Sequence, residues 1–423
     1  MKKVKVGLIG FGTVGSGVYR LLQKNSDIIA LRTGLEIEIK TICDIDTAKV
    51  KQTVPGVNVT DNWEDIINDT EIQIVIELIG GIDPAESIIL SALEKEKNVV
   101  TANKKLLAEK VSDIFAESGK KINKIRFEGA VGGGIPCILS LKEGFAANRI
   151  QSIMGILNGT TNYILSQMTE KGMTFEEALT DAQEKGFAEA DPMFDINGYD
   201  AGHKIALLAM LSFNRLIDFS SISIEGISMI GEMDIAYAAE MGYVIKLLGI
   251  AKDIDGLIDI RVHPTMLPAK HPLAAVHDEY NAVLFDCDMT GPVTFLGKGA
   301  GAAPTSSAVV SDIIQIIERD VIEESAIIIR GDADFLPRRE RIGRYYIRIL
   351  TQDHPGILSR ISGVIGEYGI SIASFLQKDI DEEYVPLIIM THEAAESEML
   401  AAIETIKDFD FVSDDLVLIR IEE

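Results

Sequence analysis

The chain has 423 residues, of which 47% are hydrophobic and 25% charged, and its formal net charge is −25. This length predicts about three domains with cores of their own. The acidic balance argues against nucleic acid and anionic membranes as partners, and no apolar run is long enough to predict a membrane-spanning helix. Cys43, Cys137 and Cys287 are widely spaced, so they predict neither a disulfide framework nor a zinc cluster and fit a cytoplasmic protein.

A glycine-rich turn follows the first predicted strand, residues 3–9. It reads Gly10-Phe11-Gly12-Thr13-Val14-Gly15, and a helical stretch comes directly after it. Strand, G-x-G-x-x-G and helix form the sequence context of a dinucleotide site. The first glycine permits a tight turn, the second lets the backbone approach a pyrophosphate, and the third lets helix and strand pack closely. We therefore predict dinucleotide binding here, rather than a plain glycine turn.

An acidic residue, Asp44, ends the next predicted strand, 36–43, which follows a predicted loop at 26–34. A carboxylate at this position is typical of sites that bind the ribose hydroxyls of NAD. Lys49 or Lys51 would instead suit the 2′-phosphate of NADP, so the sequence leaves NAD and NADP open. The structural alternative for Asp44 is a cap on the helical segment 46–51.

Further α/β units follow, with strands predicted at 74–78, 99–101 and 125–128 and a helix at 84–93. Lys104 lies just beyond one strand, where ligands bind in open parallel sheets. Glu128 ends another and precedes the loop 129–136, whose first six residues contain four glycines. We predict a shaped loop that approaches a ligand closely, with a flexible linker as the alternative.

The densest group of ionisable side chains lies between residues 182 and 204. Asp200 and Lys204 are four residues apart, so on a helix they share one face, and the chain turns apolar after Lys204. This pattern favours a site that binds a small polar molecule and moves a proton. The plain alternative is a surface ion pair on a helix capped by Asn197.

The region 137–300 predicts a mixed α/β domain, with helices at 205–213 and 241–251 and strands at 259–262 and 281–287. A helix is also predicted at 306–319. The histidines at 203, 263, 271 and 277 lack metal-ligand spacing, so we expect them to be structural.

Beyond a predicted linker the chain reads strand, helix, strand, strand, helix, strand, which is the ferredoxin-like order. These elements are predicted at 345–351, 357–368, 372–379, 384–391, 394–407 and 416–421. An Asp-x-Pro-Gly turn, Asp353 to Gly356, follows the first of these strands.

Together these stretches resemble homoserine dehydrogenase from residue 1 to about residue 325, and the tail resembles an ACT domain. Supporting stretches are 10–15, 101–104, 128–136, 155–162 and 297–305. The long family pattern is matched without a gap by Ala182, Gly186, Phe187, Ala188, Asp191, Pro192, Asp195, Ile196, Gly198, Asp200 and Lys204.

The resemblance implies an α/β protein with three domains. A Rossmann-type dinucleotide-binding domain would span 1–136 and be completed by 301–325. A mixed α/β domain for substrate binding and dimerisation would span 137–300. A linker at 326–343 would lead to a ferredoxin-like ACT domain at 344–423.

The implied activity is the reversible NAD(P)-dependent interconversion of L-homoserine and L-aspartate 4-semialdehyde, on the route to threonine, methionine and isoleucine. By resemblance, Lys204, Asp200 and Lys104 would be catalytic, and Glu189, Asp195, Asp200 and Gly186 would bind substrate. Cofactor would be bound by residues 10–15, Asp44, Lys104 and Gly301.

The resemblance also implies a monovalent cation such as sodium, held largely by backbone carbonyls at Glu128, Val131, Gly133 and Ile135. It also implies that the chain forms a homodimer or homotetramer. The ACT domain suggests threonine as a feedback ligand. The alternative is that the ACT domain binds no ligand and serves only for dimerisation. Two other functions stay open: a dehydrogenase for a related amino-acid semialdehyde, and a non-catalytic sensor of nucleotide and amino acid.

Overall fold

The computed structural model describes residues 2–118, 124–319, 329–378 and 383–423, and the chain divides into two compact units. The first comprises residues 1–153, 202–222 and 280–333, and the second comprises 154–201, 223–279 and 334–423. Parts of the predicted domains lie outside the described residues: 1, 119–123 and 320–325 of the first domain, 326–328 of the linker, and 379–382 of the ACT domain, which include the predicted strand end at 379.

The first unit contains a six-stranded parallel sheet in the order β3-β2-β1-β4-β5-β6. This is the doubly wound order of dinucleotide-binding domains, in which the order reverses between β1 and β4. The strands are β1 (Lys2–Ile9), β2 (Leu35–Cys43), β3 (Asn58–Thr60), β4 (Ile74–Glu77), β5 (Asn98–Thr101) and β6 (Ile125–Arg126).

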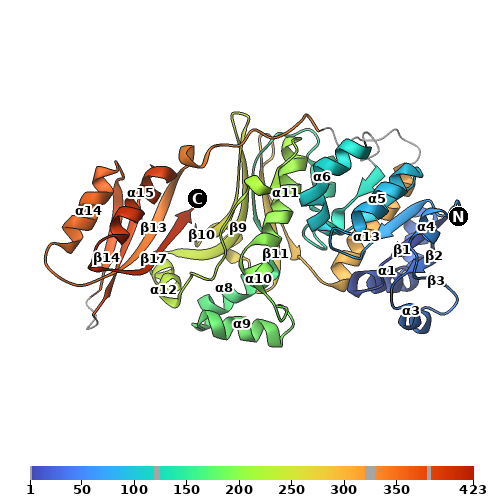
Figure 1. The fold of residues 1–423 in the computed structure, drawn as a ribbon, viewed down its shortest axis with the longest axis horizontal. Coiled ribbons are helices and arrows are strands. Elements are labelled where there is room, and N and C mark those ends of the chain that lie inside the picture. Colours follow the sequence, from blue (N-terminus) through green and yellow to red (C-terminus); the bar gives the residue numbers. More distant parts are fainter. Residues whose placement is uncertain (1, 119–123, 320–328, 379–382) are drawn as a thin grey trace. The chain divides into compact units, whose positions relative to one another are not determined.

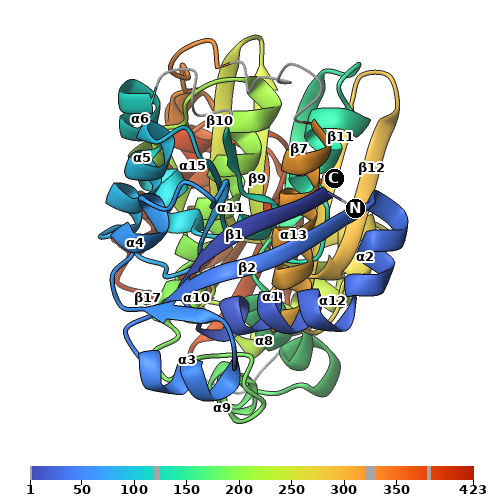
Figure 2. The ribbon, with the colours of Figure 1, turned by 90° about the vertical axis from the view of Figure 1, so that its right-hand side faces the viewer.

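Helices flank this sheet, with α1 and α13 on one side and α5 and α6 on the other (Figure 2). Val309, Ile313 and Ile317 of α13 join the core formed by β1, β2 and α1, so a segment late in the sequence completes the domain. The helices are α1 (Thr13–Lys24), α2 (Ser26–Thr33), α3 (Thr47–Thr53), α4 (Glu64–Ile67), α5 (Ala85–Glu94), α6 (Lys104–Ser118) and α13 (Ala302–Arg319).

Short helical turns and a hairpin complete the first unit. The strand predicted at 125–128 is shorter than expected, because Glu128 already begins a 3-10 turn. The elements are η2 (Glu128–Ala130), α7 (Cys137–Leu139), η3 (Ser140–Gly144), η4 (Phe219–Ser221) and the antiparallel pair β11 (Tyr280–Cys287) and β12 (Gly291–Lys298).

In the second unit, six strands run in the order β9-β10-β17-β13-β15-β14. The last four of these form the ferredoxin-like ACT sheet, and β17 pairs in parallel with β10 at Thr265 and Met266. The strands are β9 (Tyr243–Ile254), β10 (Leu257–Pro268), β13 (Ile342–Thr351), β14 (Ile372–Gln377), β15 (Val385–Thr391) and β17 (Val412–Ile421), with short additions at β8 (Ser223–Ile224) and β16 (Ala394–Ala395).

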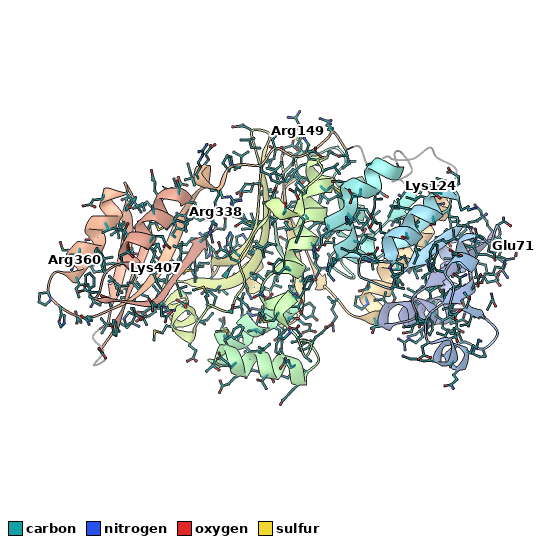
Figure 3. All side chains as sticks on the ribbon, viewed as in Figure 1. Glu71, Lys124, Arg149, Arg338, Arg360 and Lys407 are labelled. Carbon is teal, nitrogen blue, oxygen red and sulfur yellow. The ribbon has the colours of Figure 1, made fainter. Side chains whose placement is uncertain are left out.

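Two helices, α14 (Ile357–Glu367) and α15 (Glu396–Lys407), pack on one face of the ACT sheet (Figure 1). Their outer surfaces carry charged side chains such as Arg360 and Lys407 (Figure 3). The remaining elements of this unit are α8 (Gly159–Lys171), α9 (Phe175–Glu184), α10 (Met193–Ile196), α12 (Glu232–Glu240), η5 (Pro272–Ala275) and η6 (Arg338–Glu340). Strand β7 (Ile150–Ile156) and helix α11 (Tyr199–Phe213) cross the boundary between the units.

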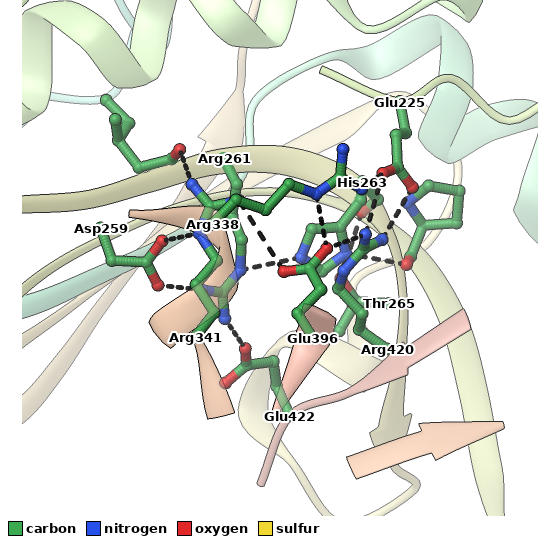
Figure 4. Close-up of polar contacts among 12 residues, drawn as sticks. Glu225, Asp259, Arg261, His263, Thr265, Arg338, Arg341, Glu396, Arg420 and Glu422 are labelled. Carbon is green, nitrogen blue, oxygen red and sulfur yellow. Dashed lines mark hydrogen bonds and ion pairs between the residues drawn. The ribbon is translucent and has the colours of Figure 1, made fainter. Parts of the chain in front are cut away.

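A cluster of charged side chains, here called the arginine cluster, ties the ACT domain to β10 (Figure 4). Arg420 of β17 donates to Glu225 over 2.7 and 2.9 Å and to Glu396 of α15 over 2.5 Å. Its other members are Asp259, Arg261, Arg338, Arg341 and Glu422. The predicted linker therefore supplies two arginines, Arg338 and Arg341, to a packed junction.

Two secondary-structure predictions are wrong. Residues 26–34 form helix α2 and its left-handed end at Gly34 (φ 71°), rather than a loop. Residues 243–254 form strand β9, rather than a helix, because this apolar run pairs with all of β10 over twelve residues. The alternative in which Asn197 caps the start of the helix that carries Asp200 is also not met. Asn197 ends α10, and α11 begins at Tyr199 after Gly198 (φ 86°).

Candidate active site and cofactor site

The glycine turn has the geometry that a dinucleotide requires. Gly10 has a φ of 94°, and a Cβ there would meet the carbonyl of Leu78 at 2.8 Å. A Cβ on Gly15 would lie 2.1 Å from the carbonyl oxygen of Gly10. By contrast, a Cβ on Gly12 would meet nothing within 4 Å, although Gly12 stands at the N-terminus of α1. The open space at Gly12 and the helix N-terminus fit a pyrophosphate.

Asp44 lies at the carboxyl end of β2 and supports this turn. Its Oδ2 accepts a hydrogen bond from the backbone N–H of Phe11 over 2.6 Å, and its Oδ1 accepts from the N–H of Asp46 over 2.9 Å. The cap of α3 is Asp46, whose side chain accepts from the N–H of Lys49. The carboxylate of Asp44 therefore stands beside the glycine turn, where the sequence predicted it.

At the carboxyl edge of the sheet, Glu77 and Asn103 hold the loops that follow β4 and β5. The sequence assigned neither residue a role. Glu77, at the end of β4, is fully buried and accepts from Thr101 Oγ1 over 2.6 Å, and burial raises its pKa. Asn103 donates to the carbonyl of Gly81 over 2.6 Å and accepts from the N–H of Leu106. These bonds fix the start of α6, whose first residue is Lys104.

Two buried acids underlie the glycine loop at 129–136. The carboxylate of Glu128 accepts from the N–H groups of Ile138 and Leu139 over 2.9 and 2.7 Å, and Asp312 of α13 accepts from the N–H of Glu128 over 2.8 Å. Burial raises the pKa of Glu128 to about 7 and that of Asp312 to about 8. Asp312 was missed because nothing in the sequence marks a single acid on an apolar helix 184 residues away.

The predicted cation ligands are largely backbone carbonyls. The Glu128 carboxylate faces N–H donors, so the predicted ligand atom of this residue is its backbone carbonyl rather than its side chain. Among the residues the structure describes, no group of three or more His, Cys, Asp or Glu side chains has the geometry of a metal site. Backbone carbonyls at Glu128, Val131, Gly133 and Ile135 stay a prediction.

The glycine loop packs against a second one, at 297–301. The N–H of Gly134 donates to the carbonyl of Lys298 over 3.1 Å, and a Cβ on Gly133 would lie 2.6 Å from the carbonyl carbon of Gly299. Gly301 has a φ of 109° and directly precedes α13. Glycine is thus required for the close approach of the two loops.

Helix α11 carries both Asp200 and Lys204, one turn apart, and both side chains are buried at 5% and 6% exposure. The neighbouring His203 faces elsewhere: its Nε2 lies 2.9 Å from Oε1 of Glu109, and its ring stacks on Phe219. Buried charges of this kind require partners or a function.

The acidic segment before α11 is held by the first turn of α8. Asn158 donates from Nδ2 to Asp195 Oδ1 and to Asp200 Oδ2, both over 2.8 Å. Asp191 accepts from the N–H of Met193 over 3.2 Å, which makes it a turn residue. Gly186 occupies a left-handed turn with a φ of 77°, and the Glu189 side chain is exposed. Asn158 was not singled out in the sequence, although it belongs to the family-like stretch 155–162.

A doubly wound sheet with this glycine turn, and a helix that buries an acid and a lysine one turn apart, define an oxidoreductase that uses a nicotinamide dinucleotide. Comparison with known proteins narrows this class. Residues 10–128 match the NAD-binding domain of homoserine dehydrogenase, residues 136–314 match homoserine dehydrogenase itself, and residues 345–411 match the ACT domain. The chain belongs to the homoserine dehydrogenase family.

Relatives of full length support this assignment. The homoserine dehydrogenase of Neisseria gonorrhoeae is 42% identical, and the match covers 100% of this chain and 99% of the relative. The crystal structure of a homoserine dehydrogenase from Thiobacillus denitrificans is 40% identical over 100% of this chain and 99% of its own, with a TM-score of 0.94. A hyperthermophilic archaeal homoserine dehydrogenase, solved as a mutant in complex with NADPH, is 25% identical over 75% and 98% of the two chains, with a TM-score of 0.64.

These findings confirm the predicted fold class, the family and the nicotinamide cofactor. Among the described residues, no helix is both long enough and apolar enough to span a membrane.

Proposed function

We propose that this chain oxidises L-homoserine reversibly to L-aspartate 4-semialdehyde with NAD(P), on the route to threonine, methionine and isoleucine. One observation carries the proposal: α11 buries Asp200 and Lys204 one turn apart, within the region that matches the family. A buried amine suits proton transfer to or from an alcohol oxygen.

In this mechanism Lys204 moves a proton at the substrate oxygen. During oxidation the neutral amine of Lys204 takes the hydroxyl proton of homoserine, and the bound nicotinamide supplies the hydride acceptor. In the reverse direction the ammonium of Lys204 returns that proton to the aldehyde oxygen. The proposed sodium ion would brace the loop at 129–136 through the carbonyls of Glu128, Val131, Gly133 and Ile135.

The acids of the segment 186–200 select the amino-acid end of the substrate. Asp200 and Glu189 would bind the α-ammonium group, because carboxylates attract and accept hydrogen bonds from it. Asp195 would keep these groups in place, and Gly186 would allow the turn that leads into them. Lys104, at the start of α6, would neutralise the substrate carboxylate or bind the nicotinamide ribose.

The cofactor would lie along residues 10–15, with its pyrophosphate at Gly12 and the returning loop at Gly301 nearby. The end of β2 carries groups suited to either dinucleotide. Asp44 suits the ribose hydroxyls of NAD, and the exposed Lys49 and Lys51 suit the 2′-phosphate of NADP. The ratio of the initial rates with NAD and with NADP shows whether Asp44 or the two lysines determine the cofactor preference.

Regulation and assembly complete the proposal. The ACT domain would bind threonine as a feedback ligand, and the chain would form a homodimer or homotetramer. These two proposals follow from the resemblance and from the match at 345–411.

The test is an assay of purified protein at the NAD(P)H absorbance band. L-homoserine should support turnover with at least one of the two cofactors, and threonine should lower the rate. Turnover of a different amino-acid alcohol in place of homoserine would favour the related semialdehyde dehydrogenase. Cofactor binding without turnover of any such substrate would favour the sensor.

A further inference from the structure

Asn158 makes more hydrogen bonds than its position in the helix requires. As the N-cap of α8, its Oδ1 accepts from the N–H of Thr161 over 2.8 Å. That bond fixes which end of the side-chain amide carries oxygen, so the nitrogen must face the other way. The side chain is 4% exposed, and its amide nitrogen lies between two carboxylates.

Those two carboxylates come from different elements. Asp195 belongs to α10 and Asp200 to α11, yet one nitrogen of Asn158 donates to both, each over 2.8 Å. Two carboxylates this close to one another repel, and a donor shared between them lowers the cost of that repulsion. Each N–H of the amide has one acceptor, so the bridge uses the full donor capacity of the side chain.

The neighbouring Thr160 ties the same segment to the same helix end. Its hydroxyl donates to the carbonyl of Phe187 over 2.6 Å, and it lies 3.1 Å from Oδ2 of Asp195. The first turn of α8 therefore holds the acidic segment at both ends. Within that arrangement, Asn158 alone among these contacts reaches Asp200.

We propose that Asn158 is a positioning residue, whose amide orients the carboxylates of Asp195 and Asp200 for recognition of the substrate ammonium group. This inference rests on the proposed function of Asp200. Asn158 itself touches neither substrate nor cofactor in this role. The competing explanation is that Asn158 only caps α8, a role that needs its oxygen and not its nitrogen.

Two substitutions separate the explanations. Serine and aspartate are about as good as asparagine at an N-cap, so Asn158→Ser and Asn158→Asp both keep the cap. Neither can donate to both carboxylates, and aspartate adds a third negative charge. Thr174→Ala is the matched control, because Thr174 caps α9 through the N–H of Glu177 and contacts neither acid.

The measurements are KM and kcat for L-homoserine, KM for the cofactor, and the thermal midpoint. For Asn158→Ser we expect kcat/KM for homoserine to fall about 10- to 100-fold, the usual range for a lost hydrogen bond to a charged group. The loss should appear mainly in KM for homoserine, and Asn158→Asp should lose more. KM for the cofactor should stay unchanged, and Thr174→Ala should have a lower thermal midpoint with unchanged kcat/KM.

Wild-type kcat/KM in Asn158→Ser and Asn158→Asp would overturn the inference, as would equal losses for homoserine and cofactor. Asp200→Asn distinguishes failure of the positioning role of Asn158 from failure of the substrate-binding role of Asp200. If Asp200→Asn also keeps normal kinetics, the proposed role of Asp200 fails. A double-mutant cycle on thermal unfolding between Asn158→Ser and Asp200→Asn tests the bridge without any substrate, and additive effects would contradict it.

Discussion

Arg348 of β13 and Asp234 of α12 form a buried ion pair, with Nε of Arg348 2.8 Å from Oδ1 of Asp234. Both side chains are almost inaccessible, at 4% and 0% exposure. Tyr346 also donates to Asp234 over 3.0 Å, and Asp415 accepts two bonds from Arg348 on the other side. This pair anchors the ACT sheet to a helix that precedes the ACT domain in the sequence.

Removing Asp234 should destabilise the protein strongly, because it leaves the arginine buried without its closest partner. For Asp234→Ala we expect the free energy of unfolding to fall by about 3–5 kcal/mol, measured by urea denaturation. The matched control is Glu240→Gln on the same helix, which breaks the exposed pair with Lys378 and should change stability little. Similar losses for the two variants would contradict a stabilising role for the buried pair.

The glycine turn allows a test that separates folding from cofactor binding. Gly12→Ala should fold normally, since its Cβ meets nothing within 4 Å, but should bind NAD(P) more weakly because the methyl group occupies the space for the pyrophosphate. Gly15→Ala should instead lose stability, since its Cβ would lie 2.1 Å from a backbone oxygen. Thermal unfolding without cofactor and fluorescence titration with cofactor measure the two effects. Equal behaviour of the two variants would refute this division of roles.

The buried Lys246 makes stability depend on pH. Its Nζ donates to the carbonyl of Val276 over 2.6 Å and to Oδ1 of Asn162 over 3.1 Å, and burial lowers its pKa from 10.5 to about 8. Between these two values the unfolded chain binds more protons than the folded one, so this group makes stability rise with pH through that window and fall again as pH drops toward 8.

Lys246→Met should remove this dependence. Relative to the variant, the wild-type free energy of unfolding should gain on the order of 3 kcal/mol between pH 8 and 10.5. Urea denaturation at a series of pH values gives the difference, and Lys171→Met, which removes an exposed lysine, should leave the wild-type slope intact. Parallel pH curves for wild type and Lys246→Met would show that the lysine keeps its ordinary proton affinity in the folded chain.

The sequence predicted those parts of the fold that depend on local signals. The turn at Gly10–Gly15 and the ferredoxin-like order of the tail both follow from glycine positions and hydrophobic patterning along short segments. Strand β9 was mistaken for a helix because a continuous apolar run has no period that separates a buried strand from a buried helix. Its pairing with β10 is a tertiary property that no window of residues contains.

The site was predictable where the chemistry lies in one segment, and not where it is assembled from distant ones. Asp200 and Lys204 are adjacent on one helix, so their spacing alone placed them on one face. Asn158, Asp312 and Glu77 act through partners 24 to 184 residues away, and only the folded chain brings those partners together. The arginine cluster has the same origin, since its charges come from the residue after β8, from β10, from the predicted linker and from the ACT domain.

The most direct test of the account is the turnover of Lys204→Met with L-homoserine. We predict a fall in kcat of about 100- to 10,000-fold, the usual contribution of a general acid–base group, with cofactor affinity close to wild type. Lys105→Met, which removes an exposed lysine on α6, should turn over normally. A Lys204→Met enzyme with wild-type kcat would contradict proton transfer by this amine and, with it, the proposed mechanism.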